Sequence, residues 1–189
     1  MKNLMLLVCL LLPASAWAQS KIETPWLQQG QMQVGIGLGA GWGDKLGGNV
    51  RLTPYAQYFI KNNWALRIEG RLGLNGVDTD QYLGGGLLTQ YHFVHTSRLS
   101  IFGQAGYFYG QGSQGRSRVA TEYPSTTTRY ESNAIRYSYG MINVGLGAQY
   151  QVNKRWFLNV LAEKNLGKKV NGSRLDGHNL SLGVGFRIK

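Results

Sequence analysis

Seven ionisable side chains stand at positions that could support chemistry in the folded chain. They are Arg51, Arg67, Glu69, Arg71, His92, Glu163 and Arg187. Paired carboxylates can act as general acid and base when one of them keeps its proton near neutral pH. Arginines keep a neighbouring carboxylate ionised, and both glutamates are expected among arginines. We therefore expect a salt-bridged polar cluster with no catalytic residue, and we expect His92 to belong to it instead of acting as a base.

Nucleotide-binding and metal-binding signatures are weak in this sequence. The run "GLGAGWG" has glycines spaced as in a nucleotide-binding loop, but no helix follows, so strand packing explains it better. No segment has the Cys, His, Asp and Glu spacing of a metal site. The sequence therefore predicts neither a metal ion nor a cofactor.

The first residues of the chain have the pattern of an export signal. Lys2 precedes an apolar run over residues 4–12, and Ala16-Trp17-Ala18 matches a cleavage site, so residues 1–18 are expected to be a signal peptide. The run is too short for a retained transmembrane helix, which needs about 20 apolar residues. Because Cys9 is the only cysteine, the exported chain is expected to have no disulfide and no thiol nucleophile.

Composition and charge narrow the class of protein. With 43% hydrophobic and 15% charged residues, the chain is too apolar for a disordered polypeptide. Its formal net charge of +11 indicates a polyanionic partner, either nucleic acid or an anionic lipid surface. An exported chain rarely meets nucleic acid, so the signal peptide favours the lipid surface and we expect no nucleic-acid partner.

The segments that carry the ionisable residues alternate between apolar and polar positions with a period of two. Eight such segments cover residues 32–42, 51–60, 64–72, 83–93, 99–107, 142–152, 156–163 and 180–188. No charged residue occurs on the apolar side of any of them, whereas the opposite side carries the arginines and glutamates. The two sides must therefore face different solvents.

Two features place the apolar side outside, in lipid, and not inside as in a soluble barrel of the lipocalin type. The polar side combines large charged residues with rows of glycine such as Gly35, Gly37 and Gly39, which suits a narrow lumen that side chains must fill. Aromatic residues gather at the segment ends, as in the girdles of membrane barrels. They are Trp42 and Tyr107 at one end and Tyr58, Trp64, Phe93, Tyr150, Trp156 and Phe186 at the other.

Short and long connections alternate along the chain. The short ones cover residues 61–63, 95–98 and 153–155, and the longest, residues 110–135, is expected to be a mobile outer loop because it has few aliphatic side chains. The sequence thus predicts an all-β fold, an eight-stranded antiparallel up-and-down transmembrane β-barrel with its apolar face outward and a polar, filled lumen. Residues 19–30 are expected to form a short N-terminal periplasmic segment, and residues 31–189 the barrel domain.

The units "KNNWALRIEGRLGL" and "NKRWFLNVLAEKN" and the last strand "NLSLGVGFRIK" resemble the small outer-membrane β-barrel proteins of the OmpA and OmpX type. The resemblance covers essentially all of the exported chain. It implies a monomer in the bacterial outer membrane that contacts membrane lipids and, during assembly, periplasmic chaperones and the barrel-insertion machinery. One departure is that Phe186 is followed by Arg187, Ile188 and Lys189, whereas the family's assembly signal usually ends on the aromatic residue.

Basic residues cluster where the long loops are expected. They are Arg116, Arg118, Arg129, Arg136, Lys164, Lys168, Lys169 and Arg174. At or above the outer headgroups these residues would meet the phosphates of lipopolysaccharide. The alternative is a solvated loop surface that charge keeps soluble.

Three functions remain open at this point. We expect a non-enzymatic envelope protein with a structural or interaction role carried by its outward loops, and the first alternative is a narrow pore. The second alternative, a lipid A-modifying enzyme, would need a serine and a histidine together near the outer leaflet. Strand parity places His178 in lipid but Ser181 in the lumen, and Ser173 beside His178 is expected to be a coincidence within a loop.

Overall fold

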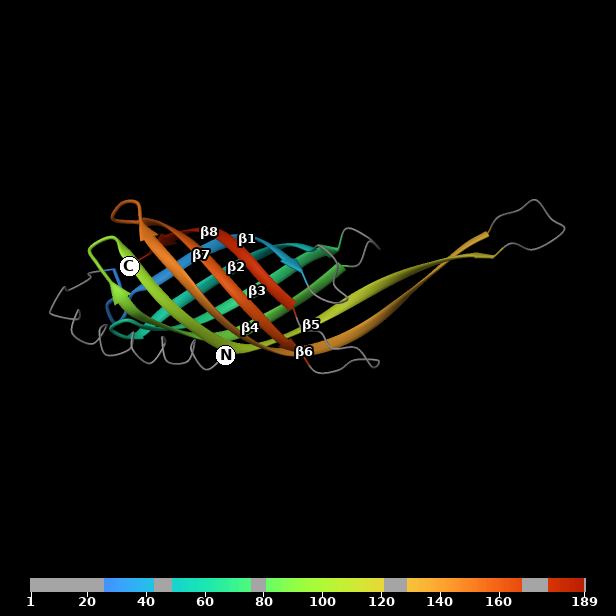
Figure 1. The fold of residues 1–189 in the computed structure, drawn as a ribbon, viewed down its shortest axis with the longest axis horizontal. Helices are drawn as coiled ribbons and strands as arrows, with labels where there is room; N and C mark the ends of the chain where they lie inside the picture. The colour runs from blue at the N-terminus through green and yellow to red at the C-terminus, as the bar shows by residue number, and fades with distance from the viewer. Residues whose placement is uncertain (1–25, 43–48, 76–80, 121–128, 168–176, 189) are drawn as a thin grey trace, which may run out of the picture.

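The structure is a computed structural model that describes residues 26–42, 49–75, 81–120, 129–167 and 177–188; within these ranges, side chains 49, 74, 75, 81, 113–120 and 129–137 are not described. The strands are β1 (Met32–Trp42), β2 (Asn49–Lys61), β3 (Trp64–Asn75), β4 (Gln81–His95), β5 (Leu99–Ala120), β6 (Arg129–Gln151), β7 (Trp156–Gly167) and β8 (Gly177–Arg187). Each strand pairs antiparallel with the next, and β1 pairs with β8, which closes the barrel (Figure 1). The predicted fold class is confirmed.

The alternating sequence explains which side of the wall meets which solvent. Outward-facing leucines are largely exposed, as in Leu38 (60%), Leu146 (64%) and Leu182 (63%). Inward-facing charged side chains are instead buried, as in Arg71 (2%) and Glu163 (4%). Such an inverted distribution is stable only when lipid surrounds the wall. Within the described residues, no helix has both the length and the hydropathy needed to cross a membrane.

Inward-facing glycines make room for the large side chains of the lumen. A Cβ atom added to Gly84 would lie 2.5 Å from Cζ of Phe108, which is closer than a real carbon contact. Phe102 occupies the equivalent space beside Gly147, and Phe157 does so beside Gly185. The glycine rows therefore compensate for bulky residues on neighbouring strands, as a narrow barrel requires.

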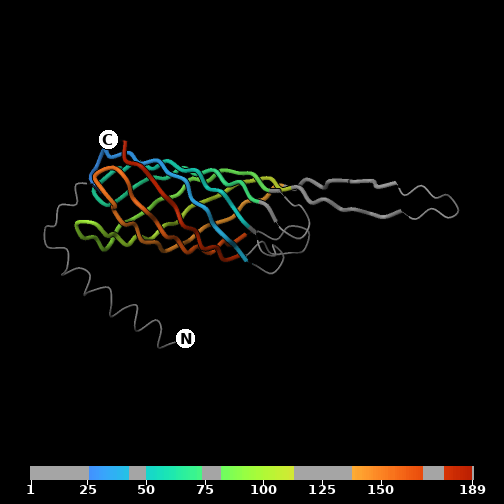
Figure 2. Tube along the Cα trace, turned by 90° about the horizontal axis from the view of Figure 1, so that it is seen from above, coloured from blue at the N-terminus to red at the C-terminus, as the bar shows by residue number. Residues whose placement is uncertain are grey.

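The two ends of the barrel differ in their connections. Three tight connections join β2 to β3, β4 to β5 and β6 to β7, and Asn63 takes a φ of 65° in the first. We call this end the turn rim and the opposite end the loop rim. The start of the described chain and its C-terminal end both lie at the turn rim (Figure 2). The loop-rim connections 43–48, 76–80 and 168–176, like the expected signal peptide 1–18, lie outside the described residues.

The prediction of a long loop over residues 110–135 is wrong. Strands β5 and β6 stay paired from Gly110 opposite Tyr139 to Ala120 opposite Arg129. They form a two-stranded ribbon that extends well beyond the other strands at the loop rim (Figure 1). The prediction considered only apolar burial, whereas a hairpin is also held by its backbone hydrogen bonds, and Val119, Tyr130 and Ile135 are of residue types that favour strands.

Candidate functional site

Five of the seven ionisable residues meet at the middle of the lumen. Arg67, Glu69 and Arg71 alternate along β3 and so point to one side of the wall. Glu69 accepts hydrogen bonds from Nε of Arg67 at 3.1 Å and from Nε of Arg71 at 2.7 Å. On β7, Glu163 faces them, accepting from Nη2 of Arg71 at 2.9 Å and from Arg51 on β2. We call these five residues the ionic cluster.

The ionic cluster is buried and nearly neutral. Its three guanidinium groups and two carboxylates leave one excess positive charge, with every side chain at most 6% exposed. Two aromatic rings stabilise the arginines through cation–π contacts. The guanidinium carbon of Arg67 lies 3.7 Å from the ring centroid of Tyr55, and that of Arg71 lies 4.6 Å from the ring centroid of Phe108. Each carboxylate contacts two arginines, so neither is suited to exchange a proton as a general acid or base.

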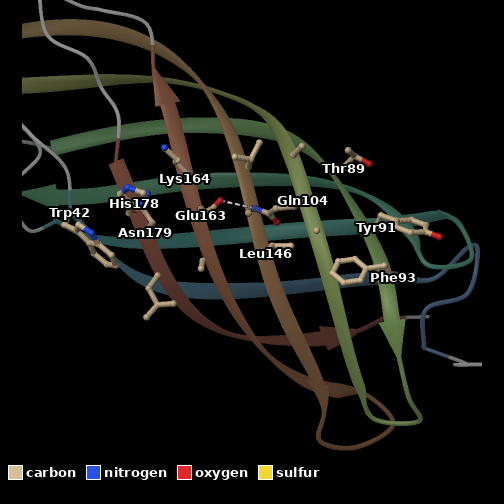
Figure 3. A pocket seen from close by; sticks show the side chains of 16 residues that line it. Trp42, Thr89, Tyr91, Phe93, Gln104, Leu146, Glu163, Lys164, His178 and Asn179 are labelled. Atoms are coloured by element: carbon tan, nitrogen blue, oxygen red, sulfur yellow. Dashed lines mark hydrogen bonds between the residues drawn. The ribbon is translucent and has the colours of Figure 1, made fainter. Parts of the chain in front are cut away.

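Glutamine side chains fill the lumen between the ionic cluster and the turn rim. Gln104 donates to Glu163 at 2.9 Å (Figure 3) and accepts from Gln90 at 2.8 Å. Nearer the rim, Gln33 accepts from Gln57 at 2.8 Å and from Gln149 at 3.0 Å. The sequence analysis missed this layer, although all five glutamines lie at inward positions of the alternating segments.

The N-terminal segment closes the lumen at the turn rim. Trp26 (2% exposed) and Leu27 (fully buried) pack against Phe59 and Ala65. The backbone is held as well, since the amide of Gly30 donates to the carbonyl of Phe59 and the amide of Asn63 to that of Leu27, both at 2.8 Å. Sequence reasoning expected a short segment here but gave no sign that it seals the barrel.

An aromatic layer fills the lumen toward the loop rim. Phe108 and Tyr139 stack with ring centroids 6.2 Å apart, and Met141 packs beside them. Tyr82 covers the same cluster from β4. The lumen is therefore filled in four successive layers, namely the N-terminal seal, the glutamines, the ionic cluster and this aromatic layer.

His92 and Arg187 lie apart from the ionic cluster. The His92 ring is fully buried near the turn rim between Phe59 and Phe102, with centroid distances of 5.5 and 5.2 Å. Its Nδ1 lies 2.5 Å from Oγ of Ser100, while its Nε2 has no hydrogen-bond partner among the described residues. Both side chains of this pair are fully buried. Arg187 lies opposite Gln33 at the turn rim, where its amide donates to the carbonyl of Arg155 at 2.7 Å.

The expected aromatic girdle lies on the outer face of the wall. Trp42 and Tyr107 are more than half exposed toward the loop rim, and Tyr58, Trp64, Tyr150 and Trp156 are 40–50% exposed near the turn rim, with Phe93 and Phe186 less exposed. Trp64 donates its indole hydrogen to Thr89 at 2.6 Å, so both groups avoid an unsatisfied bond in lipid.

The basic residues expected near the loops are spread over several places. Arg116 and Arg118 lie on β5, and Arg129 and Arg136 on β6, all within the ribbon. Lys164 lies on the outer face of β7. Lys168, Lys169 and Arg174 lie outside the described residues.

The residues considered for lipid A chemistry do not form a catalytic pair in the described chain. His178 is exposed on the outer face and stacks on Trp42 with centroids 6.2 Å apart, whereas Ser181 is 7% exposed and faces the lumen. Ser173 lies outside the described residues. In the described part of the chain, no group of three His, Cys, Asp or Glu side chains could hold a metal ion.

Three solved structures share this architecture at low sequence identity. The N-terminal β-barrel domain of Pseudomonas aeruginosa OprF is 18% identical, covers 85% of this chain and all of its own, and gives a TM-score of 0.58. Neisserial surface protein A is 16% identical over 82% of this chain and 95% of its own, with a TM-score of 0.61. Ail, the attachment invasion locus protein of Yersinia pestis, is 13% identical over 85% of this chain and all of its own, with a TM-score of 0.53.

These structural likenesses establish the fold alone, and no curated protein sequence gives a significant match. A family model provides the assignment. The model described as "Outer membrane protein beta-barrel domain" matches residues 4–187, which is nearly the whole chain. The closed wall, its lipid-facing leucines and its polar lumen agree with that match, and the chain belongs to the outer membrane protein β-barrel domain family.

Proposed function

We propose that this chain is a non-enzymatic, monomeric protein of the bacterial outer membrane, where the filled barrel anchors the β5–β6 ribbon for interaction at the cell surface. The observation that supports this proposal is the length of the ribbon, because β5 and β6 stay paired far beyond the other strands of the wall. Its assembly would use periplasmic chaperones and the barrel-insertion machinery, after removal of residues 1–18. Recognition then depends on the ribbon and the loop rim, while the barrel supplies stability.

The lumen supports an anchoring role better than a transport role. A pore needs a continuous aqueous path, and here an apolar seal and an aromatic layer lie on either side of the polar layers. The excess positive charge of the ionic cluster is the feature that favours the alternative of a narrow pore, since a lone arginine charge could select anions.

Two properties suit the ribbon to binding. The pairing of β4 with β5 ends at Ser113, and that of β6 with β7 ends at Met141, so among the described residues the outer backbone edges of the ribbon are not paired to another strand. Such edges can accept an added strand of an external partner. Arg116, Arg118, Arg129 and Arg136 add positive charge that suits lipopolysaccharide phosphates.

The proposal predicts that the ribbon can be removed without unfolding the barrel. Residues 114–135 would be replaced by a two-residue turn, and refolded parent and variant compared for heat-modifiable migration and for binding to vesicles that contain lipopolysaccharide. We expect both to migrate as folded barrels and the shortened chain to bind more weakly. Arg116→Gln with Arg118→Gln should weaken binding in the same direction, whereas Lys154→Gln with Arg155→Gln at the turn rim should not.

The same preparations discriminate the other two functions. The parent would be inserted in planar bilayers, and lipid A incubated with it would be analysed by mass spectrometry. We expect no stable conductance steps and no change in lipid A mass. Reproducible conductance would instead establish a pore, and a mass change would establish an enzyme. Equal vesicle binding by the parent and the shortened chain would overturn the role of the ribbon.

A further inference from the structure

Lys164 is an exception to the apolar outer wall. The predicted segment 156–163 ends before it, but β7 continues to Gly167. Lys164 therefore lies on the same outward side as Ala162 and Leu166, and its side chain is exposed. Among described strand side chains away from the turn rim, where exposed Lys61 ends β2, Lys164 is the one charged group on the outer face, and it forms no ion pair with described residues. A charge on the lipid face is costly unless a counter-charge meets it.

Lys164 belongs to a groove on the outside of the wall. The register joins Thr89, Ala105, Val144, Lys164, His178 and Trp42 into one row across six strands. The neighbouring row holds Gly103, which has no side chain, and Ala162, which has only a methyl group, and the surface is hollow there. A groove of about 750 Å³ follows these two rows and is lined mainly by apolar groups (Figure 3).

The dimensions of the groove suit a hydrocarbon chain. It crosses five strand spacings of about 4.8 Å each, which amounts to roughly 24 Å. It extends from Tyr91 and Phe93, toward the turn rim, to Trp42, His178 and Lys164, toward the loop rim (Figure 3). Because the hydroxyl of Thr89 is already bonded to Trp64, it does not make this part of the groove polar. The groove thus has an apolar body and one cationic end.

We propose that this groove holds one acyl chain of lipid A, with a lipid A phosphate against the ammonium of Lys164. This proposal rests on the proposed function, in which the loop rim faces outward and the protein contacts lipopolysaccharide. It adds a second contact, on the barrel wall, to the one proposed for the ribbon. A phosphate would offset the cost of the exposed ammonium in a charge-assisted contact. Trp42 and His178, stacked beside it, suit the level where headgroups meet hydrocarbon.

The cationic end binds without catalysing a reaction. Among the described outer-face side chains there, His178 stands beside Trp42, Lys164 and Leu180, and no serine or carboxylate accompanies it on that face. Acyl transfer would need a nucleophile next to that base. The groove is therefore a lipid-binding site that fixes one outer-leaflet molecule against strands β4 to β8 and β1.

The test uses the full barrel in phosphatidylcholine nanodiscs, with bound lipid counted by native mass spectrometry. The probes are purified lipid A, dephosphorylated lipid A and phosphatidylglycerol. Two variants alter the site, Lys164→Gln at the cationic end and Gly103→Leu in the groove. Gly103 tolerates a side chain, since an added Cβ would meet its nearest atoms at 3.8 and 3.9 Å. Gly70→Leu on β3 is the matched control, because that outward glycine also accepts a Cβ at ordinary contact distances, 3.5 and 3.9 Å, but lies outside the groove.

We expect Lys164→Gln to weaken lipid A binding about tenfold, the value for one lost charge-assisted contact. Dephosphorylation of the lipid should have the same effect on the parent and little further effect on the variant. Gly103→Leu should weaken binding of both forms of lipid A, while Gly70→Leu and Lys154→Gln should bind like the parent.

Three results would overturn the proposal. The first is that Lys164→Gln and Gly103→Leu both bind lipid A as tightly as the parent does. The second is a preference for phosphatidylglycerol equal to that for lipid A, which would make the occupant an anionic phospholipid. The third is loss of lipid A binding only when ribbon residues 114–135 are replaced, which would leave the proposed function standing and the groove unoccupied. Loss in the groove variants alone would instead support the groove and contradict the ribbon contact.

Discussion

Glu163 connects parts of the lumen that no other described carboxylate connects. Its two oxygens accept from Arg51, Arg71 and Gln104, which come from three different strands. Buried charges such as these lose their hydration, so their stability depends on complete pairing. Removing this one carboxylate would leave two arginines short of a counter-charge in a space that water does not readily reach.

We predict that Glu163→Gln lowers the free energy of unfolding by about 3–5 kcal/mol. Guanidinium titrations in lipid vesicles, followed by tryptophan fluorescence, would measure it. Adding Arg51→Gln to Glu163→Gln should recover part of the loss, because the ionic cluster then returns to the single excess positive charge of the parent. Lys154→Gln, in an exposed turn, should change stability by less than about 0.5 kcal/mol. A loss of only a few tenths for Glu163→Gln would indicate a hydrated lumen and would favour the narrow pore.

The sequence predicts which face of the barrel wall each strand residue occupies, but it does not predict which residue each side chain contacts. The period of two shows that Arg51, Arg71 and Glu163 point inward, because parity alone decides the face. Height along the barrel depends on strand register and shear, which the alternation does not encode. For that reason the sequence grouped His92 and Arg187 with the ionic cluster, whereas both lie near the turn rim. The contribution of the glutamines was missed because amides lack the charge that marks arginine and glutamate.

At the scale of elements, the seal and the ribbon show the limits of pattern reasoning. The strands of the wall have a strong alternation, since lipid and lumen select opposite side chains. Residues 26–31 do not alternate between lipid and lumen, so their sequence shows no period of two. The ribbon extends beyond the other strands, and the alternation of apolar and polar residues fades along its sequence. Backbone hydrogen bonds hold the ribbon, and in the seal they act together with the buried Trp26 and Leu27; such hydrogen bonds leave little trace in composition.

The seal predicts a local loss of protection when its central side chain is shortened. Leu27 is fully buried against Phe59, so Leu27→Ala should cost about 2–3 kcal/mol, at the lower end of core truncations because this site lies at a rim. Amide exchange by NMR in micelles would show it at Gly30 and Asn63, whose amides donate to Phe59 and Leu27. Gln29→Ala, at an exposed neighbour, should leave both amides protected. Unchanged exchange in Leu27→Ala would mean that the backbone alone holds the segment.

At the scale of the whole molecule, closure is the property that makes this chain compatible with a membrane. An open sheet would expose unpaired backbone groups to lipid at both edges, and each would cost several kcal/mol. The pairing of β1 with β8 removes those edges from Gln33 opposite Arg187 to Trp42 opposite His178. The first and last strands must therefore meet before the barrel is stable, although they are farthest apart in the sequence.

This seam can be locked covalently. Leu38 pairs with Leu182 on β8 and with Leu52 on β2, all three facing outward. Directly opposed residues of antiparallel strands lie about 4.5–5.5 Å apart between Cα atoms, which is within the range of a disulfide. Because the sole cysteine, Cys9, lies in the expected signal peptide, Leu38→Cys with Leu182→Cys would form one defined bridge in the exported chain.

We predict that this bridge stabilises the barrel more than the matched bridge from Leu38→Cys with Leu52→Cys. The first closes a loop that includes almost the whole wall and should contribute about 4–5 kcal/mol, whereas the second closes a short hairpin and should contribute about 3 kcal/mol. Oxidised and reduced proteins would be compared by guanidinium titration and by the temperature at which they lose folded migration on gels. Failure of the Leu38→Cys and Leu182→Cys pair to oxidise in the folded protein, while the hairpin pair does, would contradict closure between β1 and β8.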